Sequence, residues 1–503
     1  MFKPTSLALA LFLAVAPSTM SMTWSQGLAS SASGLQEDMP IQGRASGFNF
    51  DDIPDIAGGV GLIDQQKERK IGEKVFREVQ AQLPILEDDW VEGQLMQVFT
   101  TLLGQTQLGE PIALVLVNDR QINAFAVPGG LFAINAGLIS NAKNLDEVAG
   151  VMAHEIAHVT QRHYSRSTDA FKGQGLISLA GIVAGILIAS AVDPDVGGAV
   201  MMGTQAGMID RQLSYSRNQE READRVGLQY LYRAGFNPES MADFFETMHR
   251  ATSRISFLPD FWLTHPLTSQ RMSEARLFAR QLPSGRVQSR LGDDFNVLKL
   301  RISVQSSAIN EQQLKALLGS QPFAAQLALA ELYLGHGDFE KAEQALQKAA
   351  AIQPNHTLLT LLQTNLALAK NQLDKALQLV QARQRVMPEN RALNLKLAEV
   401  HIRLKQFQTA QTLLQPLVNR NVRDIRAWSL LERTARLNPN KEIAAILALR
   451  YRAEVEFWTG KEETAIKSLL HAERLATKSD SQSLKASVSQ RLKELQEERK
   501  LKL

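Results

Sequence analysis

The chain has 503 residues, enough for two or three domains that each bury a core. Its 55 basic and 52 acidic side chains give a net charge of only +3, so the strong basic field of a nucleic-acid-binding protein is excluded. Cysteine is absent, which excludes disulfides, thiolate metal sites, a cysteine nucleophile and a lipidated cysteine.

The N-terminus has the pattern of a secretory signal. Met1-Phe2-Lys3 precedes an apolar run over 7–16, which is shorter than the roughly 20 residues of a membrane span. No clear Ala-x-Ala motif marks the cleavage point, so an uncleaved anchor is the alternative. We assign 1–33 to a signal peptide and 34–61, rich in Gly, Ser, Asp and Pro, to a leader.

Residues 62–283 are expected to form an α+β domain that is mainly helical with a small sheet. Apolar residues at helical spacing alternate there with short β-branched runs and a Pro128-Gly129-Gly130 turn. The expected elements are helices over 64–82 and 88–103, a strand over 111–117, and a hairpin of 122–127 with 131–135.

A motif with metal-binding spacing lies at His154-Glu155-Ile-Ala-His158. Asn144, with Glu147 three residues later, predicts where its helix begins. Two histidines four apart share a helix face and can bind one metal ion, while Glu155 stands about 100° further round. This is the layout of a zinc peptidase; the alternative is two surface histidines on an ordinary helix.

The most apolar stretch after the signal covers 176–192 and is followed by a small-residue run to 203. Its 17 residues are at the lower limit for crossing a bilayer. A buried helical hairpin in the protease domain is the first interpretation. A membrane-surface element and a true span are the alternatives.

A catalytic zinc ion usually has three protein ligands, so a third ligand is needed. The best source is a Glu/Arg-rich helix on which Glu220 and Asp224 lie four apart on one face. Glu220 can then reach the metal and Asp224 can orient a ligand imidazole, whereas Glu222 points elsewhere. The alternative is a solvated helix face.

These motifs, followed by Thr264-His265-Pro266-Leu-Thr268 with Arg271, occur in the order of the Ste24-like and Oma-like gluzincin metallopeptidases, which the chain resembles. The resemblance implies one Zn²⁺ per chain, bound by His154, His158 and Glu220. It also implies Glu155 as general base and an acidic supporting role for Asp224.

The resemblance places the His265 loop near the metal, where a fourth nitrogen ligand would close the position that water needs. Our hypothesis is a latent state in which His265 occupies that position until the loop moves; the alternative is a loop histidine that never touches metal. The other six histidines lack ligand spacing and are interpreted as structural or surface residues, namely His163, His249, His336, His356, His401 and His471.

The expected substrate is a peptide bond in an extended chain. Leu131–Asn135 is expected to act as an edge strand that the substrate joins through main-chain hydrogen bonds, which favours unfolded polypeptides.

Residues 284–503 are expected to form an all-α tetratricopeptide-repeat solenoid, because positions recur every 34 residues. The recurring sets are Pro354 and Pro388; Ala342, Ala376 and Ala410; and Phe339, Leu373 and Phe407. The register is expected to break around 421–440, before a further unit at 457–465 and a capping helix over 484–503. A repeat array without a binding role is the alternative.

The resemblance extends over nearly the whole chain to family members with C-terminal repeats in the periplasm of Gram-negative bacteria. It implies a periplasmic endopeptidase and chaperone-like factor that degrades unfolded or stalled outer-membrane proteins and promotes their assembly. The repeats would bind the barrel-assembly machinery, and 176–203 could contact the membrane. A scaffold or chaperone with an idle zinc site and an integral membrane protease are the alternatives.

Overall fold

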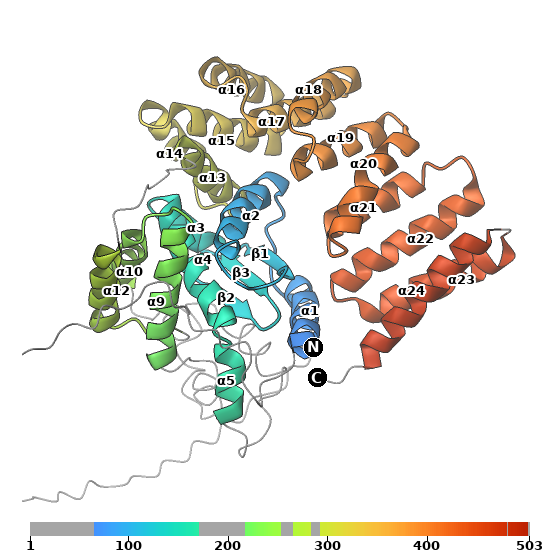
Figure 1. Ribbon diagram of the computed structural model, residues 1–503. Coiled ribbons are helices and arrows are strands. Elements are labelled where there is room, and N and C mark those ends of the chain that lie inside the picture. Colours follow the sequence, from blue (N-terminus) through green and yellow to red (C-terminus); the bar gives the residue numbers. More distant parts are fainter. Residues whose placement is uncertain (1–64, 171–216, 253–264, 283–291, 480, 501–503) are drawn as a thin grey trace, which may run out of the picture. The chain divides into compact units, whose positions relative to one another are not determined.

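The computed structural model describes residues 65–170, 217–252, 265–282, 292–479 and 481–500 (Figure 1). The predicted signal peptide and leader, and the apolar segment 176–203, lie outside the described residues. Among the described helices, none combines the length and apolar character that a membrane span needs.

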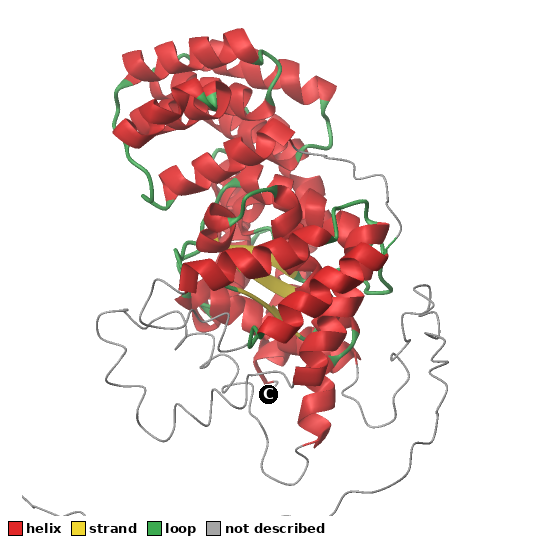
Figure 2. Cartoon of the chain, turned by 90° about the vertical axis from the view of Figure 1, so that its left-hand side faces the viewer, coloured by secondary structure: helices red, strands yellow, loops and turns green. Residues whose placement is uncertain are grey.

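A small sheet lies among the helices of the first half (Figure 2). It contains β1 (Ala113–Val117), β2 (Ala124–Val127) and β3 (Leu131–Asn135) in the order β1-β3-β2. The turn between β2 and β3 has glycines at φ +86° and +88°, a conformation that favours glycine.

The position of β3 corrects one prediction. β3 pairs in parallel with β1 and antiparallel with β2, and all five of its residues are buried. Both edges of Leu131–Asn135 are therefore used, and its expected role as an edge strand for substrate is wrong. In the described part of the chain, β2 pairs along one edge only, with β3.

The helices of the first half include the two predicted ones and surround the helix that carries the metal motif. α4 packs against α9, α10, α2 and β2. The helices are α1 (Gln65–Gln82), α2 (Asp89–Leu103), α3 (Ala136–Asn141), α4 (Leu145–Thr160), α5 (His163–Ala170), α9 (Arg217–Arg233), α10 (Glu239–Thr252) and α12 (Ser269–Gln281).

α4 begins at the predicted cap. The Asn144 side chain accepts a hydrogen bond from the backbone N–H of Glu147, at 2.9 Å. The Glu147 carboxylate accepts from the backbone N–H of Lys143 at 2.8 Å, one residue before the position of a capping box. Because these bonds fix the start of α4, His154 and His158 occupy its third and fourth turns.

The second half is all helical, as predicted, and its helices form antiparallel pairs. The predicted boundary at 283/284 lies outside the described residues. The helices are α13 (Gly292–Gln305), α14 (Glu311–Ala316), a 3-10 turn (Leu317–Gly319), α15 (Pro322–Gly335), α16 (Phe339–Ile352), α17 (Thr357–Ala369), α18 (Leu373–Val386), α19 (Arg391–Arg403), α20 (Phe407–Arg420), α21 (Ile425–Ala435), α22 (Lys441–Trp458), α23 (Glu462–Lys478) and α24 (Gln482–Lys500).

The repeat continues through the segment where a register break was predicted. α21 begins 34 residues after α19, and α22 begins 34 residues after α20. The break falls instead within α22, which has 18 residues where α20 has 14. The prediction placed it too early because Val422 and Lys441 stand at the recurring proline and Phe/Leu positions, although Ala444 continues the alanine series.

α1 contacts the last repeats. The ring centroids of Phe76 and Trp458 lie 6.1 Å apart, and Arg77 Nε lies 2.8 Å from Glu462 Oε1. Gly460, in the turn between α22 and α23, lies so close to α1 that a Cβ atom there would come 2.7 Å from the Ala81 Cβ atom. Aromatic and charged side chains therefore join the first helix to the end of the repeat array.

Candidate metal centre

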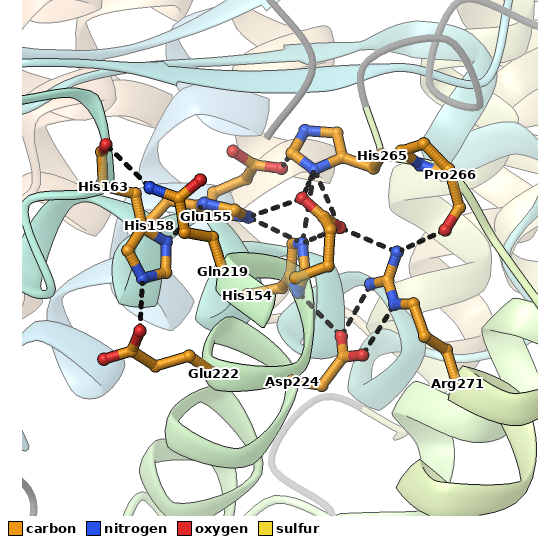
Figure 3. A network of polar contacts seen from close by, with 11 residues as sticks. His154, Glu155, His158, His163, Gln219, Glu222, Asp224, His265, Pro266 and Arg271 are labelled. Atoms are coloured by element: carbon orange, nitrogen blue, oxygen red, sulfur yellow. Dashed lines mark hydrogen bonds and ion pairs between the residues drawn. The ribbon is translucent and has the colours of Figure 1, made fainter. Parts of the chain in front are cut away.

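Four side chains from three parts of the chain converge on one point (Figure 3). α4 supplies His154 and His158, α9 supplies Glu220, and the segment before α12 supplies His265. Each is at most 2% exposed, and one donor atom from each lies within 4.8 Å of the others. The structure thus brings together all four residues that the sequence nominated as metal ligands.

The spacing of the donor atoms fits a tetrahedral metal ion. Zinc bonds of about 2.0–2.1 Å place neighbouring ligand atoms about 3.3 Å apart. The observed distances are 3.0 Å between the Nε2 atoms of His154 and His158, 3.4 Å from His158 Nε2 to Glu220 Oε1, 3.6 Å from His154 Nε2 to Glu220 Oε2, 3.1 Å from His265 Nδ1 to Glu220 Oε1, and 3.4 Å from His265 Nδ1 to His154 Nε2. Three imidazoles and one carboxylate therefore lie close enough together to share one metal ion.

His265 faces both the ligand set and the neighbouring acid of the motif. Its Nδ1 belongs to the donor cluster, and its Nε2 lies 3.4 Å from Glu155 Oε1. The ring thus stands between the fourth corner of the tetrahedron and the carboxylate that would accept a proton from water. His265 therefore lies close to the other three nominated ligands and to Glu155.

Asp224 lies behind the cluster, as its spacing from Glu220 predicted. Its Oδ1 is 3.0 Å from Nδ1 of His154, whose Nε2 faces the donor set. Arg271 adds a contact that the sequence did not predict: its Nη1 lies 2.7 Å from Glu220 Oε2 and 3.0 Å from the Pro266 carbonyl oxygen. Arg271 therefore connects the carboxylates of α9 with the loop that carries His265.

The surroundings set the protonation states of the ligands. Burial lowers the pKa of His158 far below its usual value. Burial would raise the pKa of Glu220, but the charges of His265 and Arg271 outweigh it and hold the pKa well below the usual range. A neutral imidazole and an ionised carboxylate are the forms that bind metal.

The pKa values of His154 and Glu155 are raised instead. Burial alone would lower the pKa of His154, yet Asp224 and Glu220 outweigh it and raise the pKa to about 9. Burial raises the pKa of Glu155, opposed by the charges of His265 and His154. A buried carboxyl with a raised pKa is a stronger base than an exposed one, which suits proton transfer.

The sequence interpretation missed two residues near the cluster. His163, expected to be structural or on the surface, is fully buried with its Nδ1 atom 2.9 Å from Nδ1 of His158. Glu222, expected to point elsewhere, places Oε2 3.2 Å from Nε2 of His163. Neither spacing puts the residue on the metal-facing side of a continuous helix, so helical periodicity alone could not find them.

Glycine lets the two metal-binding helices approach closely. A Cβ atom on Gly227 of α9 would lie 3.1 Å from the backbone nitrogen of His154 and 3.2 Å from the carbonyl carbon of Ala153. A larger residue would push α9 away from α4 and with it Glu220 away from the histidines.

A ligand set of this kind, with a carboxylate base beside it, defines a metallopeptidase of the gluzincin type. Comparison with known proteins gives the same result. Residues 89–278 match the model of peptidase family M48, and residues 367–434 match a tetratricopeptide repeat. The chain belongs to peptidase family M48, and it carries tetratricopeptide repeats after the peptidase domain.

Relatives over most of the chain support this assignment. The chain is 30% identical over 433 residues to the beta-barrel assembly-enhancing protease of Escherichia coli (strain K12), covering 84% of this chain and 87% of that protein. It is 32% identical over 441 residues to a putative beta-barrel assembly-enhancing protease of Vibrio cholerae, covering 84% and 89%. It is 26% identical over 212 residues to the mitochondrial metalloendopeptidase OMA1 of Arabidopsis thaliana, covering 40% of this chain and 41% of that protein. The predicted resemblance is therefore confirmed.

Proposed function

We propose that this metallopeptidase is a zinc endopeptidase that cleaves unfolded outer-membrane proteins in the periplasm, and that it binds zinc through His154, His158 and Glu220. The observation that carries the proposal is the convergence of four buried side chains, with five donor distances between 3.0 and 3.6 Å that are close to the spacing of about 3.3 Å between ligands of one zinc ion. Membership of peptidase family M48 supports the presence of a bound metal ion, and the nitrogen and oxygen donor atoms favour zinc.

In the proposed reaction each residue has one task. Bound zinc supplies Lewis acidity, activating a water molecule and polarising the scissile carbonyl group. Glu155 takes the proton from the water and later delivers it to the leaving amine. Asp224 and Arg271 keep His154 and Glu220 in place, because a displacement of about 1 Å in a positioned group can strongly lower the reaction rate.

The substrate is proposed to add to β2 rather than to β3. β2 leaves one edge open in the described structure, and the Ala126 backbone lies near enough to the buried Glu155 to lower its pKa, so this edge lies beside the general base. A small hollow lined by Ala126, His158 and Tyr164 lies beside this strand. Strand addition uses main-chain hydrogen bonds and selects extended, unfolded chains.

The enzyme is proposed to rest in a latent state. Nδ1 of His265 would take the metal position that the reacting water needs, and Nε2 of the same ring lies beside the general base Glu155. One ring would therefore exclude the water and contact the group that accepts its proton. Release of His265 from the metal position requires movement of the segment around Pro266. Arg271 holds this segment by donating a hydrogen bond to the Pro266 carbonyl oxygen. Docking of a client is the proposed trigger.

The cellular role is proposed from the relatives named as beta-barrel assembly-enhancing proteases. The chain would be exported to the periplasm, where it would degrade stalled barrel proteins and promote the assembly of others. Its repeats would bind the assembly machinery, because stacked helical pairs offer an extended surface for partners. The segment 176–203 would provide any peripheral membrane contact.

The test compares the wild type with Glu155→Gln. Both proteins should bind one zinc ion per chain, while cleavage of an unfolded outer-membrane protein should fall by about 10²–10⁴-fold in the variant because it lacks a proton acceptor. The same substrate, folded in detergent, serves as the matched control and should resist cleavage.

Equal inactivity of the two proteins, together with normal partner binding, would overturn the protease proposal in favour of a scaffold or chaperone with an idle zinc site. Retention of the mature protein in membranes after carbonate extraction would contradict a peripheral protein and support an integral membrane protease.

A further inference from the structure

We propose that His163 and Glu222 form a positioning pair that holds the metal ligand His158 through a histidine-to-histidine hydrogen bond. The inference rests on the proposed zinc site and adds two residues to it. Neither residue supplies a donor atom to the cluster: His163 contacts the far nitrogen of His158, and Glu222 contacts His163.

The directions of the hydrogen bonds follow from the chemistry of imidazole. His158 turns Nε2 into the donor cluster, 3.4 Å from Glu220 Oε1, so with metal on Nε2 its proton is on Nδ1. That Nδ1 lies 2.9 Å from Nδ1 of His163, which must then accept the hydrogen bond. The proton of His163 is therefore on Nε2, and this atom donates to Glu222 Oε2 at 3.2 Å.

The chain conformation after α4 creates this contact. On an uninterrupted helix, residues five apart point about 140° away from each other. Here α4 ends at Thr160, and Arg162 adopts φ +50° before α5 begins at His163. This left-handed residue redirects the chain, so that the His163 ring returns to the metal-binding face of α4. Such a conformation is costly for a residue with a side chain, and a functional contact is one reason to retain it.

Neighbouring groups fix both members of the pair. Gln219 donates from Nε2 to the backbone carbonyl oxygen of His163 at 3.1 Å. Arg166 Nη1 lies 3.0 Å from Glu222 Oε2. Gln219 and Glu222 lie on α9 close to the ligand Glu220 (Figure 3). The helix that supplies Glu220 therefore also supplies Glu222, the residue that supports His158 through His163.

The two histidine ligands are then supported in different ways. His154 meets the Asp224 carboxylate directly, with Nδ1 and Oδ1 3.0 Å apart. The Nδ1 atom of His158 instead lies 2.9 Å from the His163 ring, which in turn contacts the Glu222 carboxylate. A partner on the far nitrogen of a ligand histidine fixes its ring and tautomer, and removing such partners costs 10–100-fold in metal affinity as a rule of thumb.

The experiment measures zinc affinity by competition with a chelator, using the full mature chain and zinc as the probe. His163→Leu removes the acceptor and fills a similar volume. His163→Asn keeps an acceptor oxygen near the position of Nδ1. His356→Leu is the matched control, because His356 is also largely buried and contacts a carboxylate, with Nε2 3.2 Å from Asp294 Oδ1, but lies in the repeat array.

We expect His163→Leu to weaken zinc binding by about 10–100-fold and His163→Asn by less than about tenfold. Glu222→Leu should give a smaller loss in the same direction, because its side chain is 24% exposed. His356→Leu should lower the melting temperature without changing zinc affinity. Circular dichroism of the zinc-free proteins checks that each is folded, and Glu222→Leu decides the question if His163→Leu does not fold.

Unchanged zinc affinity in His163→Leu, or an equal loss in the leucine and asparagine variants, would overturn the positioning role in favour of simple packing. Those results would leave the proposed zinc peptidase intact. Failure of the wild type to bind zinc would instead overturn the proposed function, and the inference with it.

Discussion

Arg271 and Asp224 form two parallel hydrogen bonds, from Nε to Oδ2 and from Nη2 to Oδ1, each 2.8 Å long. Their side chains are 4% and 7% exposed. Planar pairing of this kind is the strongest arrangement that an arginine and a carboxylate can adopt. Because Asp224 also contacts His154 and Arg271 also contacts Glu220, the pair joins both helices of the metal site.

Replacing Arg271 should therefore destabilise the protein. In Arg271→Met the buried carboxylate of Asp224 loses its cation, and the free energy of unfolding should fall by about 3–5 kcal/mol. Urea denaturation of the zinc-free wild type and variant measures the difference. Arg250→Met is the matched control, since its contact with Glu246 is exposed and should change stability by less than about 1 kcal/mol.

The double variant Asp224→Leu with Arg271→Met separates stability from metal binding. Removing both charges should recover much of the lost stability. Zinc affinity should stay low, because His154 still lacks the contact to Nδ1. A double variant that binds zinc as tightly as the wild type would show that Asp224 does not support His154.

Replacing His265 should activate the enzyme. His265→Ala empties the fourth corner of the donor cluster and frees Glu155 from the ring 3.4 Å away. If the open state is about 1% populated in the wild type, cleavage of an unfolded protein can rise by up to about a hundredfold. Steady-state cleavage at saturating zinc measures the effect.

The exposed His336 at the end of α15 provides the control, and His336→Ala should leave cleavage unchanged. The zinc dissociation rate should also increase in His265→Ala, since one of four donors is lost. Cleavage at the wild-type rate would contradict the latent state.

Zinc affinity should depend on pH through His154. The pKa of about 9 means that in the zinc-free protein this imidazole carries a proton at neutral pH, which zinc must displace. The lowered pKa values of His158 and Glu220 mean that they release none. Apparent affinity should therefore rise about tenfold per pH unit from about pH 7 and level off above about pH 9.

Chelator competition across this range gives the slope. Asp224→Asn removes a group that raises the His154 pKa, so its curve should level off at a lower pH. A slope corresponding to two protons in the wild type would contradict a single titrating ligand.

The parts of the site that could be predicted from the sequence are those fixed by helical periodicity. Residues four apart on one helix share a face whatever surrounds them, so His154 with His158 and Glu220 with Asp224 lie where their spacing indicated. His163 could not be found in this way, because its position depends on the left-handed conformation of Arg162, which no local pattern signals.

The edge of the sheet was predicted incorrectly for a related reason. Alternation and β-branched residues located all three strands, but they do not say which strand lies in the middle. That order depends on the parallel pairing of β1 with β3, a contact between strands that are not adjacent in the chain. Only the fold shows that the open edge beside Glu155 belongs to β2.

Two glycines in equivalent turns allow a test of the contact between α1 and the repeats. Gly337 and Gly460 follow helices of the array at φ +76° and +77°, so alanine at either should cost roughly 1–2 kcal/mol of backbone strain. A Cβ at Gly337 would meet no atom within 4 Å, whereas at Gly460 it would lie 2.7 Å from the Ala81 Cβ and the Arg77 carbonyl oxygen.

Gly460→Ala should therefore lower the free energy of unfolding by about 1–3 kcal/mol more than Gly337→Ala, because the clash adds to the strain. Urea denaturation of both variants measures the difference. Arg77 belongs to the same contact through Glu462, so Gly460→Ala should also make α1 more sensitive to limited proteolysis. Equal destabilisation by the two substitutions would mean that α1 and the last repeats do not pack together in solution.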